Sequence, residues 1–280
     1  MASKHAARLG GDKYQHLYSW WLILALKLPE ENVQKVIIEN GQAGKVDDVT
    51  VHYKPGTTKP DRFYQIKYHV DHREMYSSAS IIQSVNGQQS LLEKFWSTWK
   101  ELRQKTPEKA VEVYLISSWS WDAADILGKW VSGVTDSIKV DEFMAEKPNT
   151  EPGKIRREWQ RVLGASDEDF KTFIGCLHFR LGYSLNVLLD EQVTGRMKSL
   201  GLKTDPATLL AIQSIVSNWI ITNKNEITLK MLEDALRDND LYLPEEPELS
   251  IAVHMETIAK TKPERKPDYH FDWLGLMKVN

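Results

Sequence analysis

Acidic, amide and ammonium side chains alternate along two neighbouring strand-like segments, GKVDDVTVHY and RFYQIKYHV. Residues two apart in an extended strand share a face, so Asp48 lies on one face of the first segment, and Gln65 and Lys67 share a face of the second. Glu39 closes the preceding segment and adds a second carboxylate. Carboxylates beside an ammonium are groups that hold a hard divalent cation and orient a water. If the strands pair, these side chains meet.

A simpler interpretation is the water-facing side of an amphipathic sheet. For each residue taken singly this is the commoner situation, since charged side chains are mostly exposed. The combination argues against it, because Asp is disfavoured within strands and Asp47-Asp48 opens a segment otherwise made of Val, Thr and Tyr. Both interpretations remain open from the residues alone.

Composition limits the class of protein. The 280 residues carry 36 Lys+Arg and 39 Asp+Glu, a net charge of −3, so no overall basic field announces nucleic acid, although a local basic groove is compatible with this balance. The single cysteine, Cys176, excludes an intramolecular disulfide and fits a reducing compartment. The apolar run LYSWWLILALKL contains Lys27 and is shorter than the about 20 residues of a membrane span. We therefore expect a cytoplasmic protein with no membrane partner and a buried first helix.

The elements that would position the candidate residues follow from periodicity. Asp12 is a candidate N-cap for a first helix over 13–28, and Asp122 for a helix through Trp130. Strands are expected at 33–39, 45–53, 62–70 and 110–118, and a long helix over 79–105. Beyond residue 136 strand signals disappear, and helices are expected over 153–164, 167–182, 185–200, 206–223 and 228–238, with Asp167 and Thr228 as N-caps.

These elements predict an α/β (α+β) fold, a mixed sheet flanked by helices and followed by an all-helical C-terminal region. The expected divisions are a core over 1–135, a helical region packed on it over 136–243, and a linker with a docking tail over 244–280. The tail ends in the apolar sequence FDWLGLMKV, which has little beyond it to pack against.

The order of Glu39, Asp48 and the segment Gln65–Lys67 resembles the motif of the PD-(D/E)xK restriction-endonuclease-like superfamily, in its variant with Gln in place of the (D/E). The closer resemblance is to the double-stranded DNA endonuclease domain of bacterial antiphage effectors, known from nuclease subunits of CBASS and Lamassu-type systems. The matching features, in chain order, are GGDKYQHLYSW, a Glu, an Asp-Asp pair, Tyr-Gln-x-Lys and LISSWSWDAADIL. The resemblance spans about residues 8 to 240.

This resemblance implies a metal-dependent endonuclease with low sequence specificity. Asp48, Glu39, Gln65 and Lys67 would be the catalytic residues, with Asp48, Glu39 and the Ile66 backbone carbonyl as ligands of Mg²⁺ (or Mn²⁺). Lys67 would position or deprotonate the attacking water. Because Gln65 is neutral, metal would bind more weakly until the scissile phosphate completes the site.

Other residues are assigned supporting roles by the same resemblance. Gln15 and Asp47 would orient the ligands, and Arg8, Lys13 and His69 are candidate DNA contacts, although His69 also fits a sheet edge. A zinc site at His69 and His72 and a phosphate loop at GQAGK are disfavoured, because the ligand set and the spacing are incomplete.

The expected partners are double-stranded DNA, a second copy of the chain, and a regulator. Cutting both strands calls for paired active sites, hence a homo-oligomer. The regulator would be a sensor or ATPase subunit or a fused C-terminal sensor domain. The main alternative is a catalytically inactive DNA-binding or assembly subunit that retains the fold, an option that Gln65 keeps open. A restriction or repair nuclease would share the chemistry and differ in biology.

Overall fold

The structure of the chain, a computed structural model, describes residues 4–41, 44–46, 48–70, 75–243, 269–271 and 277–279. Residues 1–242 form one compact unit and 243–280 a second. The first unit is built on a six-stranded mixed sheet with the order β5-β4-β3-β2-β1-β6. The predicted α/β class is therefore confirmed.

The sheet combines an antiparallel meander with a parallel half. Adjacent pairs β6–β1, β1–β2 and β2–β3 are antiparallel, whereas β3–β4 and β4–β5 are parallel. β-Branched and aromatic residues dominate these segments, as strands with two covered faces require. The strands are β1 (Val33–Ile38), β2 (Val49–Tyr53), β3 (Asp61–Lys67), β4 (Val111–Ser117), β5 (Leu177–Arg180) and β6 (Glu226–Ile227).

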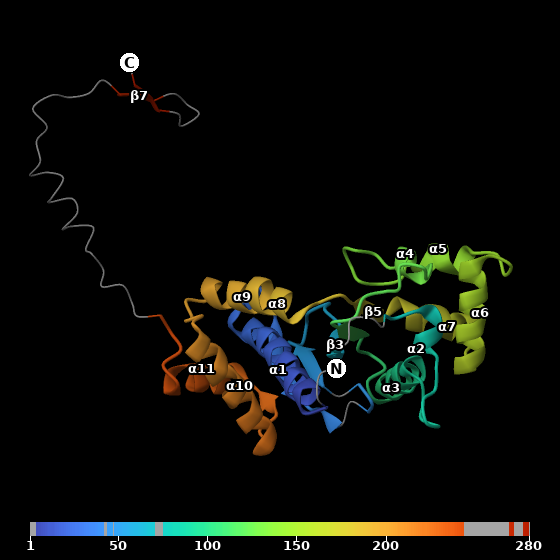
Figure 1. The fold of residues 1–280 in the computed structure, drawn as a ribbon, viewed down its shortest axis with the longest axis horizontal. Helices are drawn as coiled ribbons and strands as arrows, with labels where there is room; N and C mark the ends of the chain where they lie inside the picture. Colours follow the sequence, from blue (N-terminus) through green and yellow to red (C-terminus); the bar gives the residue numbers. More distant parts are fainter. Residues whose placement is uncertain are drawn as a thin grey trace, which may run out of the picture. The chain divides into compact units, whose positions relative to one another are not determined.

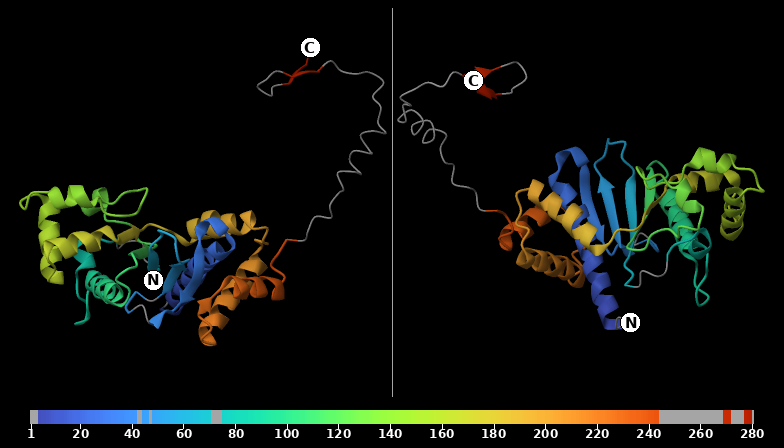
Figure 2. Two further views of the ribbon diagram at one scale, coloured as in Figure 1. Left: turned by 180° about the vertical axis from the view of Figure 1, so that it is seen from behind. Right: turned by 45° about the horizontal axis from the view of Figure 1, so that its top comes forward.

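Helices cover both faces of the sheet, and the two groups lie on either side of it in Figures 1 and 2. One group is α1 (Lys4–Ile23), the short helices η1 (Leu24–Lys27) and η2 (Pro29–Glu31), α8 (Leu185–Val187), the π-helix η4 (Leu188–Val193), α9 (Thr194–Ser199), α10 (Pro206–Ile221) and α11 (Leu229–Asp238). The other is α2 (Ser78–Ile81), α3 (Leu91–Lys105), α4 (Leu127–Trp130), α5 (Val140–Ala145), α6 (Glu151–Leu163) and α7 (Asp167–Gly175).

Strand alternation divides the core into two clusters, one on each face. Tyr64 and Ile66 of β3 belong to the cluster beneath α1, which also holds Val49 and Val51 of β2. Phe63 belongs to the cluster beneath α3. Gln65 and Lys67, which alternate with Tyr64 and Ile66, therefore lie on the α3 face.

Several predicted boundaries are wrong for identifiable reasons. α1 begins at Lys4, so Asp12 lies inside the helix and is not its N-cap. The helix expected over 79–105 is interrupted, because Asn86 and Gly87 have φ values of 54° and 72°. It restarts after Ser90, whose side chain forms a capping box with Glu93.

Other errors concern helix starts and a missed strand. The helix expected from Asp122 begins only at Leu127, and Ser166 rather than Asp167 caps α7. Thr228 caps α11 as predicted. The helix expected over 167–182 ends at Gly175, and the following residues form β5. These four residues adopt the strand conformation because they pair with β4, and so short a segment does not reveal its conformation by periodicity.

The second unit contains two paired short strands, β7 (Tyr269–Phe271) and β8 (Met277–Val279). The rest of the predicted docking tail lies outside the described residues. In the part of the chain that the structure describes, every helix is too short or too polar to cross a bilayer.

Candidate active site

The candidate residues meet where β2 begins and β3 ends. Val49 pairs with Tyr64 in the antiparallel register, which places Asp48 beside Gln65. One oxygen of the Asp48 carboxylate, Oδ2, accepts a hydrogen bond from the Gln65 side-chain amide and another, at 2.5 Å, from the Ile66 backbone N–H. Gln65 is buried, so this amide–carboxylate pair is held within the sheet rather than at its water-facing side.

Glu39, the residue with the second carboxylate, is joined to Asp48 by a backbone hydrogen bond. β1 ends at Ile38, and Glu39 adopts a left-handed conformation with φ 50°. Its backbone N–H donates to the Asp48 carbonyl at 2.9 Å, and its carboxylate accepts a hydrogen bond from the Gln15 amide of α1. The turn at Glu39 thus links Asp48, through the backbone, to a residue whose side chain is bonded to Gln15 of α1.

The backbone of Ile66 faces the same end of β2. The Lys67 carbonyl accepts a hydrogen bond from Ser118 N–H, at 3.3 Å, on the β4 side. In a strand, the N–H and carbonyl of one residue point to one neighbouring strand, and those of the next residue point to the other. Because the Lys67 carbonyl points to β4, the Ile66 N–H and carbonyl both point toward β2. The Ile66 N–H bond to Asp48 agrees with this direction. The predicted carbonyl ligand therefore faces Asp48.

Lys67 shares the face of Gln65, and its charge acts on His69. His69 stacks on Trp119 with ring centroids 3.5 Å apart and an interplanar angle of 13°. Its Nε2 lies 3.2 Å from the Tyr76 hydroxyl. Burial, and after it the nearby Lys67 ammonium, lowers the pKa of His69 to about 4. At neutral pH the imidazole is uncharged.

Trp119 and Tyr76 were not singled out as site residues by the sequence. Tyr76 pairs with Trp121 through an isolated parallel bridge, and its ring lies edge-on to Trp119 with centroids 5.6 Å apart. The Ser-Trp turn after β4 was the available signal, but a tryptophan at that place is more often part of a core.

The two α1 cations predicted to contact DNA lie on different sides of the helix. Arg8 is seven residues before Gln15, which at 3.6 residues per turn is close to two turns along the same face. Lys13 lies nearly opposite Gln15 and lines a hollow of about 510 Å³ between α1 and α10. Only Arg8 shares the side of α1 that carries Gln15. Asp47 lies outside the described residues.

The donor set fits a magnesium-type cation better than zinc. Asp48, Glu39 and the Ile66 carbonyl supply hard oxygen ligands, and Mg²⁺ is usually held by one or two carboxylates together with waters and substrate phosphate. Structural zinc sites need about four N or S ligands. Among the described residues, no three His, Cys, Asp or Glu side chains form a metal-binding group.

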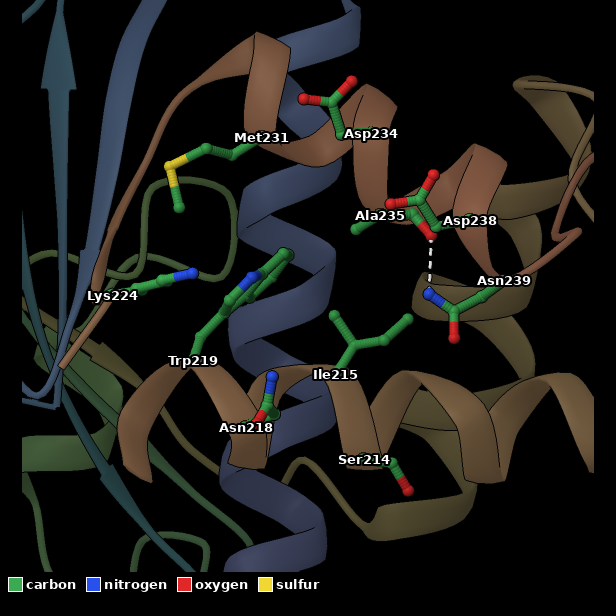
Figure 3. A pocket seen from close by; sticks show the side chains of 10 residues that line it. All are labelled: Ser214, Ile215, Asn218, Trp219, Lys224, Met231, Asp234, Ala235, Asp238 and Asn239. Atoms are coloured by element: carbon green, nitrogen blue, oxygen red, sulfur yellow. Dashed lines mark hydrogen bonds between the residues drawn. The ribbon is translucent and has the colours of Figure 1, made fainter. Parts of the chain in front are cut away.

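A separate hollow of about 410 Å³ lies between α10 and α11 (Figure 3). Two of its polar side chains are bonded to neighbouring residues of the helix: Asp234 pairs with Arg237, and the Asn239 amide donates to the Ala235 carbonyl at 2.8 Å. Its walls come from α10, α11 and the turn between them, so it does not include the candidate site.

Comparison with known proteins gives a distant structural likeness. No protein-family model matches the chain, and no curated protein matches it. Solved structures of Cap4 SAVED/CARF-domain containing receptors are similar. The Acinetobacter baumannii protein is 12% identical, with a TM-score of 0.42 over 82% of this chain and 47% of that one. The Moraxella osloensis protein is 14% identical, with a TM-score of 0.42 over 83% and 48%. The chain thus spans about half the length of these receptors.

Proposed function

We propose that this chain is a metal-dependent endonuclease that hydrolyses double-stranded DNA with low sequence specificity. The observation that carries the proposal is the double hydrogen bond to the Asp48 carboxylate, from the Gln65 amide and the Ile66 N–H. It joins the two halves of the sequence motif, which come from different strands. The backbone N–H of Glu39 donates to the main-chain carbonyl of Asp48.

The residues divide the work of phosphodiester hydrolysis among them. A bound Mg²⁺ would neutralise the attacked phosphate and acidify a water. Asp48, Glu39 and the Ile66 carbonyl would hold this ion, while Gln65 fixes the orientation of the Asp48 carboxylate. Gln15 does the same for Glu39.

Lys67 supplies the remaining charge. Its ammonium would bind the scissile phosphate and orient the attacking water, functions that suit a compact, partly desolvated cation. His69, two residues beyond the end of β3, is neutral at pH 7 and leaves the positive charge at this end of the strand to Lys67.

A role as the effector of a prokaryotic antiphage system rests on the sequence resemblance. A homo-oligomer and a sensor or ATPase regulator belong to the same proposal. Expressing the chain with its neighbouring genes in phage-challenged cells tests it: protection that requires Lys67 supports the role, and protection by a Lys67→Met variant contradicts it.

Cleavage is tested directly with supercoiled plasmid. Wild-type protein should nick it with Mg²⁺ and stop when EDTA is added, and Lys67→Met and Asp48→Asn should lower the rate by about 10²–10⁴-fold. Lys54→Met is the matched control, because Lys54 is exposed beyond the other end of β2. Nicking that survives in the two site variants would rule out this site.

The second candidate, a non-cutting DNA-binding or assembly subunit, also has an observation in its favour. The Asp48 carboxylate is already bonded to two protein donors, and a glutamine occupies the place of a second strand carboxylate. Such a carboxylate is satisfied without any ion. DNA binding without nicking, in the chain alone and together with the products of neighbouring genes, would favour this function.

A further inference from the structure

A small cavity lined by three arginines lies on the face of the sheet opposite Gln65. It has a volume of about 90 Å³, and its cationic walls are Arg62 of β3, Arg180 of β5 and Arg196 of α9. Arg62 is the second residue of β3, whereas Gln65 and Lys67 lie toward its end. The cavity is therefore separate from the candidate active site, and ligand binding in it would not depend on the proposed nuclease activity.

The guanidinium groups use few of their donors within the protein. Each guanidinium has five N–H groups. Arg62 donates from Nε to Glu112 at 2.9 Å, Arg180 from Nε to Asp136 at 2.8 Å. Arg180 adds a long contact of 3.4 Å to a tyrosine hydroxyl. Most of their donors are thus available at the cavity.

Arg196 is the least neutralised of the three. It donates to the Trp21 carbonyl at 2.8 Å and lies 4.3 Å from the centroid of that indole. Its nearest carboxylate, Glu31, is 3.9 Å away and also bonds Lys59 at 3.2 Å. Burial lowers the pKa of the Arg196 guanidinium, because Glu31 offsets only part of the desolvation. A further anion would complete this environment.

The balance of charges leaves an excess cation. Four cations and three carboxylates form the ion pairs around the cavity, a difference of one positive charge: Arg62, Arg180, Arg196 and Lys59 against Glu31, Glu112 and Asp136. His178, which stacks on Tyr114 and has a pKa lowered by burial, adds no charge at neutral pH.

The hydroxyl of a buried tyrosine faces the same space. Tyr64 is 3% exposed and lines the cavity, yet within the described part of the chain its hydroxyl makes no hydrogen bond. The Tyr64 hydroxyl and the Arg62 guanidinium act on each other electrostatically, so a donor stands beside the cation and can bond an acceptor in the cavity. Burial raises the pKa of Tyr64 well above 10, which keeps the hydroxyl a neutral donor.

We propose that this cavity binds a phosphate group, held by Arg62, Arg180, Arg196 and the Tyr64 hydroxyl. Arginine suits this ligand because its planar fork matches phosphate oxygens. The cavity volume of about 90 Å³ leaves room for a small oxyanion but not for a large ligand. It is far below the about 300–1,000 Å³ of pockets that enclose whole ligands. Either free phosphate or a phosphate whose remainder projects into solvent fits this description.

The test measures binding by calorimetry at constant ionic strength. Inorganic phosphate and adenosine monophosphate are titrated into the full chain, with chloride as the reference anion. Tyr64→Phe removes an unbonded hydroxyl and should weaken affinity about tenfold without lowering the Tm measured in the absence of phosphate. Arg196→Gln should weaken it at least as much, whereas Arg237→Gln, on the exposed surface of α11, should not change it.

The calorimetric titrations have outcomes that support the phosphate site and outcomes that overturn it. Saturable binding of either compound that is weakened by Tyr64→Phe and Arg196→Gln supports the site, and the tighter compound identifies free or attached phosphate as its source. Absence of saturable binding to the wild-type chain, or equal affinity in wild type and both variants, overturns the proposal. Neither result bears on plasmid cleavage, which depends on the other face of the sheet.

Discussion

Gly10 of α1 faces the Tyr68 ring so closely that a Cβ added at Gly10 would lie 2.7 Å from Tyr68 Cε1. The Tyr14 ring, one turn along α1, lies 5.3 Å from the same Tyr68 ring. α1 therefore rests directly on the residue that follows β3. This contact sets the position from which Gln15 reaches Glu39.

Gly10→Ala should consequently destabilise the protein, and Gly11→Ala should not. A Cβ at Gly11 meets nothing within 4 Å, so that variant should gain the about 0.5–1 kcal/mol by which alanine exceeds glycine in a helix. At Gly10 overpacking against Tyr68 should cost about 1–3 kcal/mol. Urea unfolding of the two variants measures the difference. Equal stabilities would mean that Tyr68 moves aside freely.

Replacing Gln65 by glutamate should couple stability to magnesium. Gln65→Glu removes the donor to Asp48 and sets two carboxylates together, which favours protonation of one of them. In EDTA the variant should lose about 1–3 kcal/mol of unfolding free energy. Mg²⁺ should restore more stability to it than to the wild type, as followed by thermal unfolding.

Gln65→Met is the control for that experiment. It loses the same hydrogen bond and adds no charge, so Mg²⁺ should stabilise it no more than the wild type. If Mg²⁺ stabilises the glutamate and methionine variants equally, the carboxylate at position 65 does not hold the ion.

The pKa of His69 should rise when Lys67 is replaced by methionine. Burial is the larger cause of the depressed pKa and persists in the variant, so the pKa should climb from about 4 and stay below 6.5. Histidine NMR titration measures it, with Lys54→Met as the unchanged control. An unaltered pKa in Lys67→Met would place the ammonium away from the imidazole.

The depressed pKa of His69 also affects stability. A histidine whose pKa is lower in the folded than in the unfolded chain binds fewer protons when folded. Stability associated with His69 is therefore complete above pH 6.5 and falls as the pH drops toward about 4. His69→Gln should flatten this part of the pH profile of Tm.

Asp61 should contribute stability that is lost in acid. Burial alone would raise the pKa of Asp61, but the His52 ring at 2.6 Å, the Lys109 ammonium at 2.8 Å and the Tyr53 N–H at 3.1 Å outweigh it and lower the pKa. The contribution is full above the ordinary value of 3.8 and disappears as the pH falls through the lower, folded value.

Asp61→Asn should accordingly cost about 1–3 kcal/mol at pH 7 and reduce the acid sensitivity below pH 4. Asp141→Asn, in an exposed pair with Lys171, should change stability by less than about 1 kcal/mol. Chemical denaturation at pH 7 and pH 3 compares them. A large loss of stability in Asp141→Asn, or no loss in Asp61→Asn, would contradict the stabilising role given to Asp61.

The strands of the meander were predictable because their pattern is local. Alternation around Asp48 and Gln65 correctly assigned both residues to one face, and the register then joined them. The extent of α1 was not predictable, because Gly10 and Gly11 are ordinarily helix breakers. A glycine at position 10 is explained by the Tyr68 ring, which leaves no room for a Cβ there and lies 58 positions further along the chain (68 − 10).

The arginine cavity was also invisible in the sequence. Arg62, Arg180 and Arg196 come from β3, β5 and α9, and no short motif joins them. Tyr64, Tyr114 and His178 form a stacked row across three parallel strands, with centroids 4.8 and 4.3 Å apart. That row exists only once β5 has paired with β4, the step that helical periodicity over 167–182 concealed.

The two outermost strands, β5 and β6, come from residues 177–180 and 226–227, whereas the four strands between them end at Ser117. A nascent chain released up to that point would carry β1 and β4 with open hydrogen-bonding edges, the arrangement that recruits foreign strands. Both edges are paired only when synthesis has reached Ile227, the end of β6. Truncations before β6 should therefore accumulate as insoluble protein, and translation speed through the second half of the message becomes a determinant of yield.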